Sequence, residues 1–541
     1  MPKDSHHHVN VKSSNKLGKR QRNLAVGLTS DKALLCMFIV SVAIVTISTI
    51  LVPLNLEDSV VADTSEHASQ SQTHSVSVQL KKPGQSPKQK HSNDEIIIIK
   101  EERQQPLKPK PQSTKTKNIP GNSDYFKTHS SPFHVIFSSG CSTFQDWQSY
   151  VFFYHVLQSG QEGHVTRIAS GCPTSTEENT LKDLFKEEIE TMKPGYHHLH
   201  LTPDFSRIPK KHPDKFKYFN KPYGVRHWME HALGYPDNHE LHDDSIIVLL
   251  DPDQILLRPF TRDFSNSSEY WRLQDVYRGK TVLDRPHISH KVEHGSPFSQ
   301  QYGYGIQWLT KVRPEYVFQD RLPTPVSNMT RKEATDYYFA MGPPYVATAK
   351  DMWSIVTTWS DIVPRVHDEY PYLLAEMFGY NLAAAHLGLR HTIAHSFAVS
   401  DIFSGGEGWP LIDAVPAEDV CHNFPPSEYP HVIHYCQRYF LGKWFIGKYK
   451  LRKDFISCDS PLLKIPPADL ALRYDYAIMP GDGSRKALKP KHAKEEVFML
   501  CAMIDALNSA AKYYKDKHCD KANYEYSYTF FDDMSLPEDK K

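Results

Sequence analysis

The chain has 541 residues, and its 63 basic residues balance its 63 acidic ones. This balance excludes a general binder of nucleic acid or another polyanion, because such proteins carry a large excess of positive charge. The length is enough for one large enzyme domain with extensions, and the 12% aromatic content is enough to build a large core.

The first feature that the sequence predicts is a membrane anchor. Residues 33–54 contain no charged side chain and are long enough to cross a bilayer as a helix, which takes about 20 apolar residues. Basic residues dominate residues 1–32, whereas Glu57, Asp58 and Asp63 follow the apolar segment. The positive-inside rule therefore predicts a cytosolic tail and a lumenal location for everything after the anchor. A cleaved signal peptide is the alternative, but no A-x-A-like cleavage site follows closely.

The segment after the anchor, residues 55–130, is rich in Ser, Gln, Lys, Pro, Thr and His, which indicates a disordered lumenal stem. Seven cysteines follow the anchor, in a compartment where disulfides persist, and the odd number leaves at least one unpaired within the chain. Cys501 and Cys519 would lie about 27 Å apart on one helix, so we expect them to have different partners. Two N-x-S/T sequons, which can carry glycans in such a compartment, begin at Asn266 and Asn328.

An α/β pattern begins near residue 131. The predicted elements are, in chain order, a strand over 133–139, a helix ending at Gly160, a strand over 164–170, a helix with Asn220 as its N-cap and Gly234 as its stop, and a continuous apolar strand over 245–250. A continuous apolar strand is typical of a sheet covered on both faces. This order predicts an α/β head, residues 131–460, with a mostly parallel sheet flanked by helices.

The second half of the chain is less regular. Residues 260–345 are rich in Pro, Gly, His and Tyr and favour no element. Residues 344–363 predict a short strand and a helix, and residues 371–391 predict a helix that ends near Gly388. A charged amphipathic helix over about 490–518 belongs to a C-terminal extension, residues 461–541.

Two carboxylates follow the last strand of the first half, in the sequence "SIIVLLDPDQILLRPF". In open α/β sheets, ligands bind beyond the carboxyl ends of the strands, and strand alternation puts Asp251 and Asp253 on the same side. Pro252 restricts the backbone between them, so the pair is preorganised. Paired carboxylates suit Mg²⁺ or Mn²⁺ bound to the diphosphate of a sugar nucleotide. This pattern is typical of D-x-D glycosyltransferases.

Other readings of the pattern are weaker. A D-x-D tripeptide also arises by chance, and an aspartate can simply cap a turn. A phosphatase loop of the D-x-D-x-T/V type does not fit, because Ile255 occupies its last position. His434 lies near the end of a predicted short strand and is a candidate third metal ligand, although spacing alone does not separate it from the other histidines of the chain.

Several blocks together resemble a known family. They include "HVIFSSGCS" (134–142), "NKPYGVRHWMEHA" (220–232), "IIVLLDPDQILLRP" (246–259), "AEMFGYNLAAAHLGLRH" (375–391) and "HVIHYCQRYFLGKWFIGKYKLRKDF" (431–455). In this order they are similar to the plant and algal hydroxyproline O-arabinosyltransferases and the related peptidyl serine α-galactosyltransferases. The resemblance covers roughly residues 133–456.

The resemblance implies a GT-A-like fold and a single-pass type II membrane enzyme of the Golgi or the ER. It implies a UDP-sugar donor, Mn²⁺ or Mg²⁺ as cofactor, and transfer with retention to hydroxyproline or serine hydroxyls of secretory-pathway proteins. No nucleic-acid partner is expected. The family's arabinosyltransferases more often have Glu-Pro-Asp-His where this chain has Asp-Pro-Asp-Gln, so arabinose and galactose both stay open as the donor sugar.

The same resemblance assigns roles to individual residues. Asp251, Asp253 and His434 become the metal ligands, with Asp253 also catalytic. Glu376 becomes a catalytic carboxylate that orients the acceptor hydroxyl or stabilises positive charge on the sugar. The residues expected to bind the nucleotide sugar are Ser138, Ser139, Arg167, Lys221 and Asp251. The alternative function is a non-catalytic, membrane-anchored relic of a glycosyltransferase that binds glycans or peptides.

Overall fold

The computed structural model describes residues 126, 129–207, 217–237, 240–265, 276–277, 280–281, 289–404, 406–421, 430–478 and 484–529. They belong to one compact unit, Lys110–Lys541. The expected cytosolic tail, membrane anchor and nearly all of the stem lie outside these residues and stay predictions. Within the described ranges, no helix combines the length and the apolar character that a membrane span needs.

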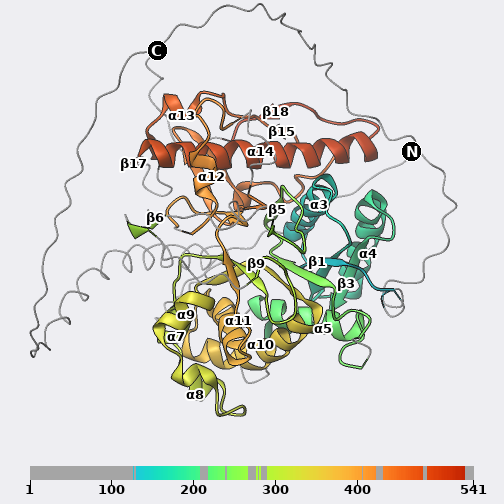
Figure 1. Ribbon diagram of the computed structural model, residues 1–541. Helices are drawn as coiled ribbons and strands as arrows, with labels where there is room; N and C mark the ends of the chain where they lie inside the picture. Colours follow the sequence, from blue (N-terminus) through green and yellow to red (C-terminus); the bar gives the residue numbers. More distant parts are fainter. Residues whose placement is uncertain are drawn as a thin grey trace, which may run out of the picture. The chain divides into compact units, whose positions relative to one another are not determined.

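A seven-stranded sheet forms the centre of the unit (Figure 1). Its strands are β1 (Phe133–Gly140), β2 (His164–Ser170), β3 (His197–Thr202), β4 (Ile246–Leu250), β8 (Phe298–Gln301), β9 (Met341–Thr348) and β10 (Thr392–Ala394). Their order across the sheet is β10-β8-β9-β4-β1-β2-β3, and β9 alone among them runs antiparallel to its neighbours. The predicted mostly parallel α/β sheet is therefore confirmed.

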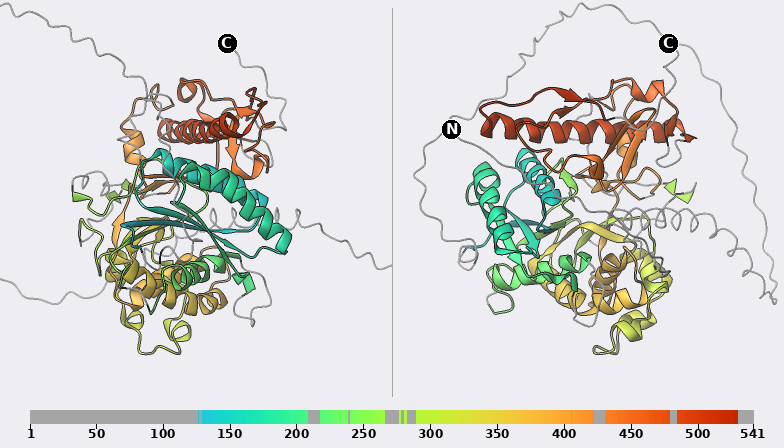
Figure 2. Two further views of the ribbon diagram at one scale, coloured as in Figure 1. Left: turned by 90° about the vertical axis from the view of Figure 1, so that its right-hand side faces the viewer. Right: turned by 180° about the vertical axis from the view of Figure 1, so that it is seen from behind.

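Strand alternation divides the interior into two hydrophobic cores. In β1, Val135 and Phe137 belong to one core and Ile136 to the other. In β4, Val248 belongs to the first core and Leu249 to the second. Because successive side chains of a strand point to opposite faces, a fully apolar strand such as β4 needs cover on both sides. Helices supply this cover on the two faces of the sheet (Figure 2).

The main helices are α3 (Thr143–Gln158), α4 (Ser175–Leu184), α5 (Asn220–His231), α10 (Ala349–Glu369), α11 (Ala375–His386) and α14 (Pro490–His518). Their ends follow the sequence signals closely, since Gly160, Gly234 and Gly388 all have positive φ just beyond a helix. The expected N-cap of α5 is wrong by one position. Asn220 is the first helical residue, because a 3-10 turn at Lys217–Phe219 already leads into the helix.

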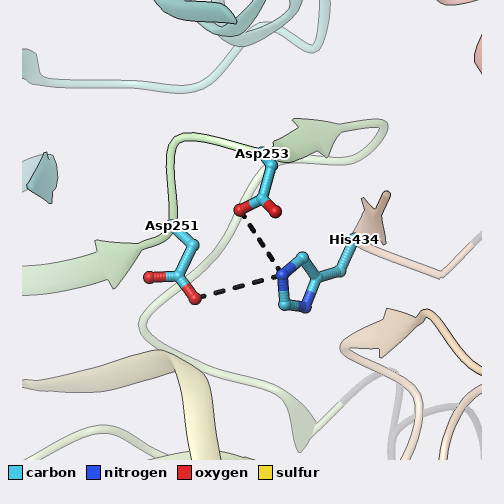
Figure 3. A group of neighbouring side chains, drawn as sticks. All are labelled: Asp251, Asp253 and His434. Atoms are coloured by element: carbon cyan, nitrogen blue, oxygen red, sulfur yellow. Dashed lines mark ion pairs between the residues drawn. The ribbon is translucent and has the colours of Figure 1, made fainter. Parts of the chain in front are cut away.

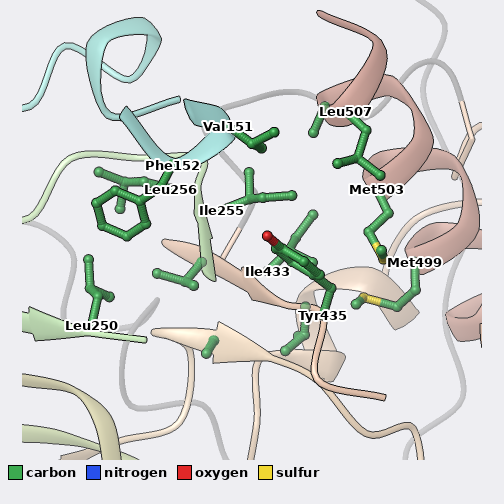
Figure 4. Packing of buried hydrophobic residues seen from close by; sticks show 14 of the residues in the cluster. Val151, Phe152, Leu250, Ile255, Leu256, Ile433, Tyr435, Met499, Met503 and Leu507 are labelled. Atoms are coloured by element: carbon green, nitrogen blue, oxygen red, sulfur yellow. The ribbon is translucent and has the colours of Figure 1, made fainter. Parts of the chain in front are cut away.

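A small second sheet continues the chain beyond β4. It consists of β5 (Gln254–Leu256), β12 (Val432–His434) and β11 (Ala398–Val399), with β12 in the middle. The core beneath this sheet contains side chains of α3, β5 and α14 together (Figure 4). Ile255 and Ile433 from the sheet lie with Val151 of α3 and Met503 of α14 in this cluster. The C-terminal helix thus stabilises the segment that follows β4.

Three disulfides staple the unit. Cys141–Cys172 joins the segments that follow β1 and β2, whereas Cys421–Cys501 and Cys458–Cys519 attach α14 to the preceding chain. The expectation that Cys501 and Cys519 have different partners is therefore confirmed. Cys436 is left without a disulfide, as the odd number of cysteines requires.

Buried histidines gather at the amino ends of the parallel strands, at the edge of the sheet opposite to Asp251. His134 of β1 lies with its ring centroid 5.9 Å from those of His164 and of His242, and His164 Nδ1 lies 2.8 Å from His198 Nε2. Phe126 packs edge-on against three of these rings. Burial, followed by the neighbouring rings, holds the pKa of His134 well below its ordinary value. Burial likewise lowers the pKa of His198 to about 3.

Because of these histidines, we expect the free energy of unfolding to fall in acid. Their pKa values are depressed in the folded state, so below the unfolded value of about 6.5 the unfolded chain binds more protons and stability falls as the pH falls. His134→Phe removes one such group, and we expect it to reduce the loss of stability between pH 6.5 and pH 5 by on the order of 2 kcal/mol. Urea unfolding at several pH values measures this effect. His129→Gln, at an exposed histidine, is the control, and an unchanged pH dependence in His134→Phe would contradict the account.

Candidate functional site

The two aspartates lie in a tight turn at the carboxyl end of β4. The Gln254 N–H donates to the Asp251 carbonyl oxygen at 3.1 Å, and the Asp251 N–H donates to Gln254 Oε1 at 2.9 Å. Gln254 Nε2 in turn donates to the Pro343 carbonyl oxygen at 3.0 Å. The buried Gln254 side chain therefore braces the turn.

His434 reaches the turn through the small sheet. β12 pairs antiparallel with β5 so that His434 lies opposite Gln254, and the Tyr435 N–H donates to the Asp253 carbonyl oxygen at 3.0 Å. As Figure 3 shows, both carboxylates face the same ring nitrogen. His434 Nε2 lies 3.4 Å from Asp253 Oδ1 and 4.0 Å from Asp251 Oδ2. The structure thus brings together the three residues that the sequence analysis chose as metal ligands.

Two lysines compensate the charge of these aspartates. Lys221 Nζ, from the first turn of α5, lies 2.7 Å from Asp251 Oδ1, and Lys448 Nζ, just after β14 (Trp444–Gly447), pairs with Asp253 Oδ2. Burial alone would lower the pKa of either lysine, but the adjacent carboxylates raise both above the ordinary value. Burial alone would raise the pKa of Asp253, but Lys448 and His434 hold it well below its usual range.

Glu376 adds a third carboxylate to the group. It lies in the first turn of α11, is 3% exposed, and its Oε1 is 3.2 Å from Lys221 Nζ. Lys221 therefore bridges Asp251 and Glu376. Burial raises the pKa of Glu376 to about 7, even though the Lys221 ammonium opposes this shift. A carboxyl group with this pKa can exchange a proton near neutral pH.

Ser138 and Ser139, two of the predicted nucleotide contacts, point to opposite faces of the sheet at the end of β1. Ser139 Oγ accepts a hydrogen bond from Arg167 Nε at 2.9 Å, and the fully buried Arg167 also pairs with Asp146 of α3 at 2.8 Å. Ser138 points to the opposite face, toward α5, where a Cβ placed on Gly224 would lie 3.8 Å from Ser138 Oγ. Arg167 therefore ties β1 to α3, and the nucleotide-binding role of these residues stays a prediction.

The structure describes one of the two predicted glycosylation sequons. Asn328 is exposed at the end of the 3-10 turn Pro325–Asn328, where a glycan has room. Asn266 lies outside the described residues.

Sequence reasoning missed two residues of this site. Lys448 lies in a basic segment whose composition is typical of a solvated surface. In the structure it directly follows Gly447, the last residue of a short hairpin, and its ammonium group pairs with Asp253. Tyr302 lies in the stretch that favours no element, and its hydroxyl oxygen is 3.0 Å from His434 Nδ1. Neither contact has a local sequence signal, because both join segments more than 130 residues apart.

The arrangement is suited to a divalent cation. One oxygen of Asp251, one oxygen of Asp253 and one ring nitrogen of His434 all lie within 4.8 Å of one another. Mn²⁺ binds both carboxylate and imidazole ligands, so all three side chains suit it. Mg²⁺ prefers oxygen ligands, so the two carboxylates suit it. The donor chemistry of the site therefore fits the metal that the resemblance implied.

Comparison with known proteins gives the class to which these features correspond. The chain is 24% identical over 336 residues to a "Peptidyl serine alpha-galactosyltransferase" of Arabidopsis thaliana, covering 62% of this chain and 34% of that protein. It is 31% identical over 127 residues to a protein of the same name from Chlamydomonas reinhardtii, covering 24% of this chain and 14% of that protein. The chain thus spans about a third or less of the length of these relatives, which are glycosyltransferases.

The family model described as "Hydroxyproline O-arabinosyltransferase family N-terminal domain" matches residues 133–270, which include β1 through the aspartate turn. This match confirms the resemblance read from the sequence blocks. Among solved structures, the bifunctional glycosyltransferase WbbM aligns with 57% of this chain and 46% of its own, at 9% identity and a TM-score of 0.29. The galactosyltransferase LgtC aligns with 56% and 87%, at 13% identity and a TM-score of 0.28. Both TM-scores are too low to define the fold.

The ion pair between Lys448 and Asp253 gives a first test of the site. Lys448→Met leaves a buried carboxylate without its ammonium partner, so we expect a loss of about 3 kcal/mol in the stability of the metal-free protein. A bound cation would replace the missing charge, so Mn²⁺ should raise the melting temperature of this variant more than that of the wild type. Differential scanning calorimetry with EDTA and with Mn²⁺ measures both effects.

Lys450→Met is the matched control, because Lys450 is exposed and has no ion pair within the described part of the chain. If Lys448→Met and Lys450→Met had equal stability and equal responses to Mn²⁺, the assignment of Lys448 to the site would be wrong.

Proposed function

We propose that the chain is a metal-dependent glycosyltransferase with a GT-A-like head, which transfers a sugar from a nucleoside diphosphate to a hydroxyl group on a protein. The observation that carries this proposal is the convergence of Asp251, Asp253 and His434 at the carboxyl edge of the parallel sheet. The strand order supports the fold, since β1 to β4 form a parallel half of the sheet and the antiparallel strand β9 lies beside β4.

The charges of the site favour an anionic ligand together with a cation. With Glu376 ionised and His434 neutral, the form in which a histidine binds a metal, three carboxylates face two ammonium groups, so the site that would receive the ion has a net negative charge. A divalent cation held by Asp251, Asp253 and His434 would reverse that sign. The positive site would then attract a diphosphate, whose oxygens complete the coordination of such ions. When bound, the ion supplies neutralisation of the charge that develops on the departing nucleotide.

The two lysines of the site have a second function in this proposal. Lys221 and Lys448 lie within contact of the carboxylates that would bind the ion, one on either side of the turn. With an ion held by these carboxylates, the ammonium groups would be available to phosphate oxygens. Lysine is a common phosphate ligand because it acts as a compact positive charge. This supports the predicted phosphate contact of Lys221 and adds Lys448 to it.

Glu376 is the candidate for the acceptor side. Its buried carboxylate shares the Lys221 ammonium with Asp251, so it lies close to the proposed diphosphate region. In its ionised form it would accept a hydrogen bond from an acceptor hydroxyl or stabilise positive charge on the sugar. Because the predicted transfer retains the anomeric configuration, a dedicated general base is not required.

The finer assignments rest on the resemblance. A UDP-sugar as donor, Mn²⁺ as the ion, and serine or hydroxyproline as acceptor follow the names of the matching family and relatives. Both relatives are named as serine galactosyltransferases, which favours galactose and serine over arabinose and hydroxyproline for the first trials. A type II location in the Golgi or ER membrane is supported by the apolar segment 33–54 and by three disulfides.

A donor screen tests the proposed function. The full-length chain in detergent is incubated with serine- and hydroxyproline-containing peptides and with UDP-, GDP- and ADP-sugars, and the released nucleotide is measured. We expect turnover with a UDP-sugar that requires Mn²⁺ or Mg²⁺, stops with EDTA, and falls at least ~100-fold in Asp253→Asn, because that change removes a ligand of the metal site.

Asp263→Asn is the control, because this exposed aspartate forms a surface ion pair with Lys291 and accepts hydrogen bonds from Ser265, none of which belongs to the site. No turnover with any of the donors would sink the proposal and favour the non-catalytic alternative. Near-normal turnover of Asp253→Asn would show that the metal site is assigned wrongly.

A further inference from the structure

Tyr302 contacts the candidate metal site from behind His434. Its hydroxyl oxygen lies 2.6 Å from the Pro343 carbonyl oxygen and 3.0 Å from His434 Nδ1. His434 Nδ1 is the ring nitrogen that faces away from the aspartates, because Nε2 is the atom that faces Asp253 and Asp251. The two nitrogens of one ring thus have different neighbours, a tyrosine hydroxyl at Nδ1 and two carboxylates at Nε2, and the Cys436 side chain also interacts with the ring.

The hydrogen-bond partners determine where the ring proton lies. A carbonyl oxygen can only accept, so the single hydroxyl proton of Tyr302 is donated to Pro343. The Tyr302 oxygen is then an acceptor toward His434, and the donor must be the Nδ1–H group of the ring. In a neutral imidazole with a proton on Nδ1, the lone pair is on Nε2. Nε2 is the nitrogen that lies beside Asp251 and Asp253, so this tautomer of the neutral ring is the one that could bind a metal there.

We propose that Tyr302 is a positioning residue that sets the tautomer and the orientation of His434 so that Nε2 can bind the metal. This inference rests on the proposed metal-dependent function and adds to it a residue outside the ligand set. Groups that bind the second nitrogen of a metal-ligating histidine fix its ring and raise its basicity, and their loss typically costs about 10–100-fold in metal affinity.

The surroundings of Tyr302 hold it in this position. Tyr302 directly follows β8, and its N–H donates to the Ala340 carbonyl oxygen at 2.7 Å. Its ring lies against Gly342, where an added Cβ would come within 2.3 Å of Tyr302 Cδ2. Pro343, which accepts the hydroxyl proton, also accepts from Gln254 Nε2 of the aspartate turn. The same carbonyl oxygen therefore links the positioning of His434 to the shape of the turn.

Mn²⁺ binding by the metal-free protein tests the inference without a donor or an acceptor. Tyr302→Phe retains the ring and removes only the hydroxyl group. Titration of the full-length protein with Mn²⁺, followed by electron paramagnetic resonance of the free ion, should give a Kd about 10–100-fold higher in this variant than in the wild type. In turnover assays the Mn²⁺ concentration for half-maximal rate should rise similarly, while the rate at saturating Mn²⁺ changes much less.

Tyr304→Phe is the matched control. The hydroxyl of Tyr304 is also buried and also donates to a backbone carbonyl, that of Met341, but it contacts Asn381 instead of His434. We expect Tyr304→Phe to leave the Mn²⁺ affinity within about twofold of the wild type, because the effect of Tyr302 passes through His434.

A double-mutant cycle separates positioning from a general structural effect. If Tyr302 acts through His434, then Tyr302→Phe has no further effect on Mn²⁺ affinity in a His434→Ala protein. An equal loss in both backgrounds, or an unchanged Kd in Tyr302→Phe alone, would overturn the inference. If Mn²⁺ binding follows the expected pattern but no donor is turned over, the proposed function fails while the role of Tyr302 stands. A wild-type protein that binds no Mn²⁺ would overturn both.

Discussion

Two buried carboxylates and a partly buried third at one edge of a sheet are the constraint on which this site depends. Asp253 and Glu376 are 6% and 3% exposed, and isolated charges at such positions are costly. Lys221 and Lys448 reduce that cost, but when all three carboxylates are ionised and His434 is neutral, as metal binding requires, one negative charge is left over. Such a site would attract a cation, and with a divalent cation bound its net charge would become positive and attract an anion. The charges of the site thus fit both parts of the proposed ligand, the cation and the diphosphate.

The fold brings these charges together from distant parts of the chain. β4 places the aspartates at the edge where parallel strands end, and α5 and α11 bring Lys221 and Glu376 to the same edge. The small sheet then carries His434 back beside the turn. α14 packs beneath this small sheet, and two disulfides attach the helix to the preceding chain. The C-terminal segment thus helps to hold the site in place, although none of its described residues contributes a charged group to it.

Much of the fold and part of the site could be predicted from sequence, because those features have local signals. An apolar run ending in Asp-Pro-Asp predicts a buried strand and a preorganised carboxylate pair, and positive-φ glycines mark the ends of α3 and α11. His434 needed the family resemblance, since its place opposite Gln254 depends on a pairing across about 180 residues. Lys448 and Tyr302 had no such signal. The bracing of the turn by Gln254 also had no sequence signal, because its partner Pro343 lies far along the chain.

The central claim is that Asp251, Asp253 and His434 form one cation site that also receives a diphosphate. Crystals of the protein grown with Mn²⁺ and UDP, measured at the manganese absorption edge, test it most directly. The account predicts one strong anomalous peak within coordination distance of the two carboxylates and His434 Nε2, with diphosphate oxygens beside it and the Lys448 ammonium near a phosphate. A structure with UDP bound but no anomalous peak at this position, and with Lys221 and Lys448 still paired to the aspartates, would contradict it.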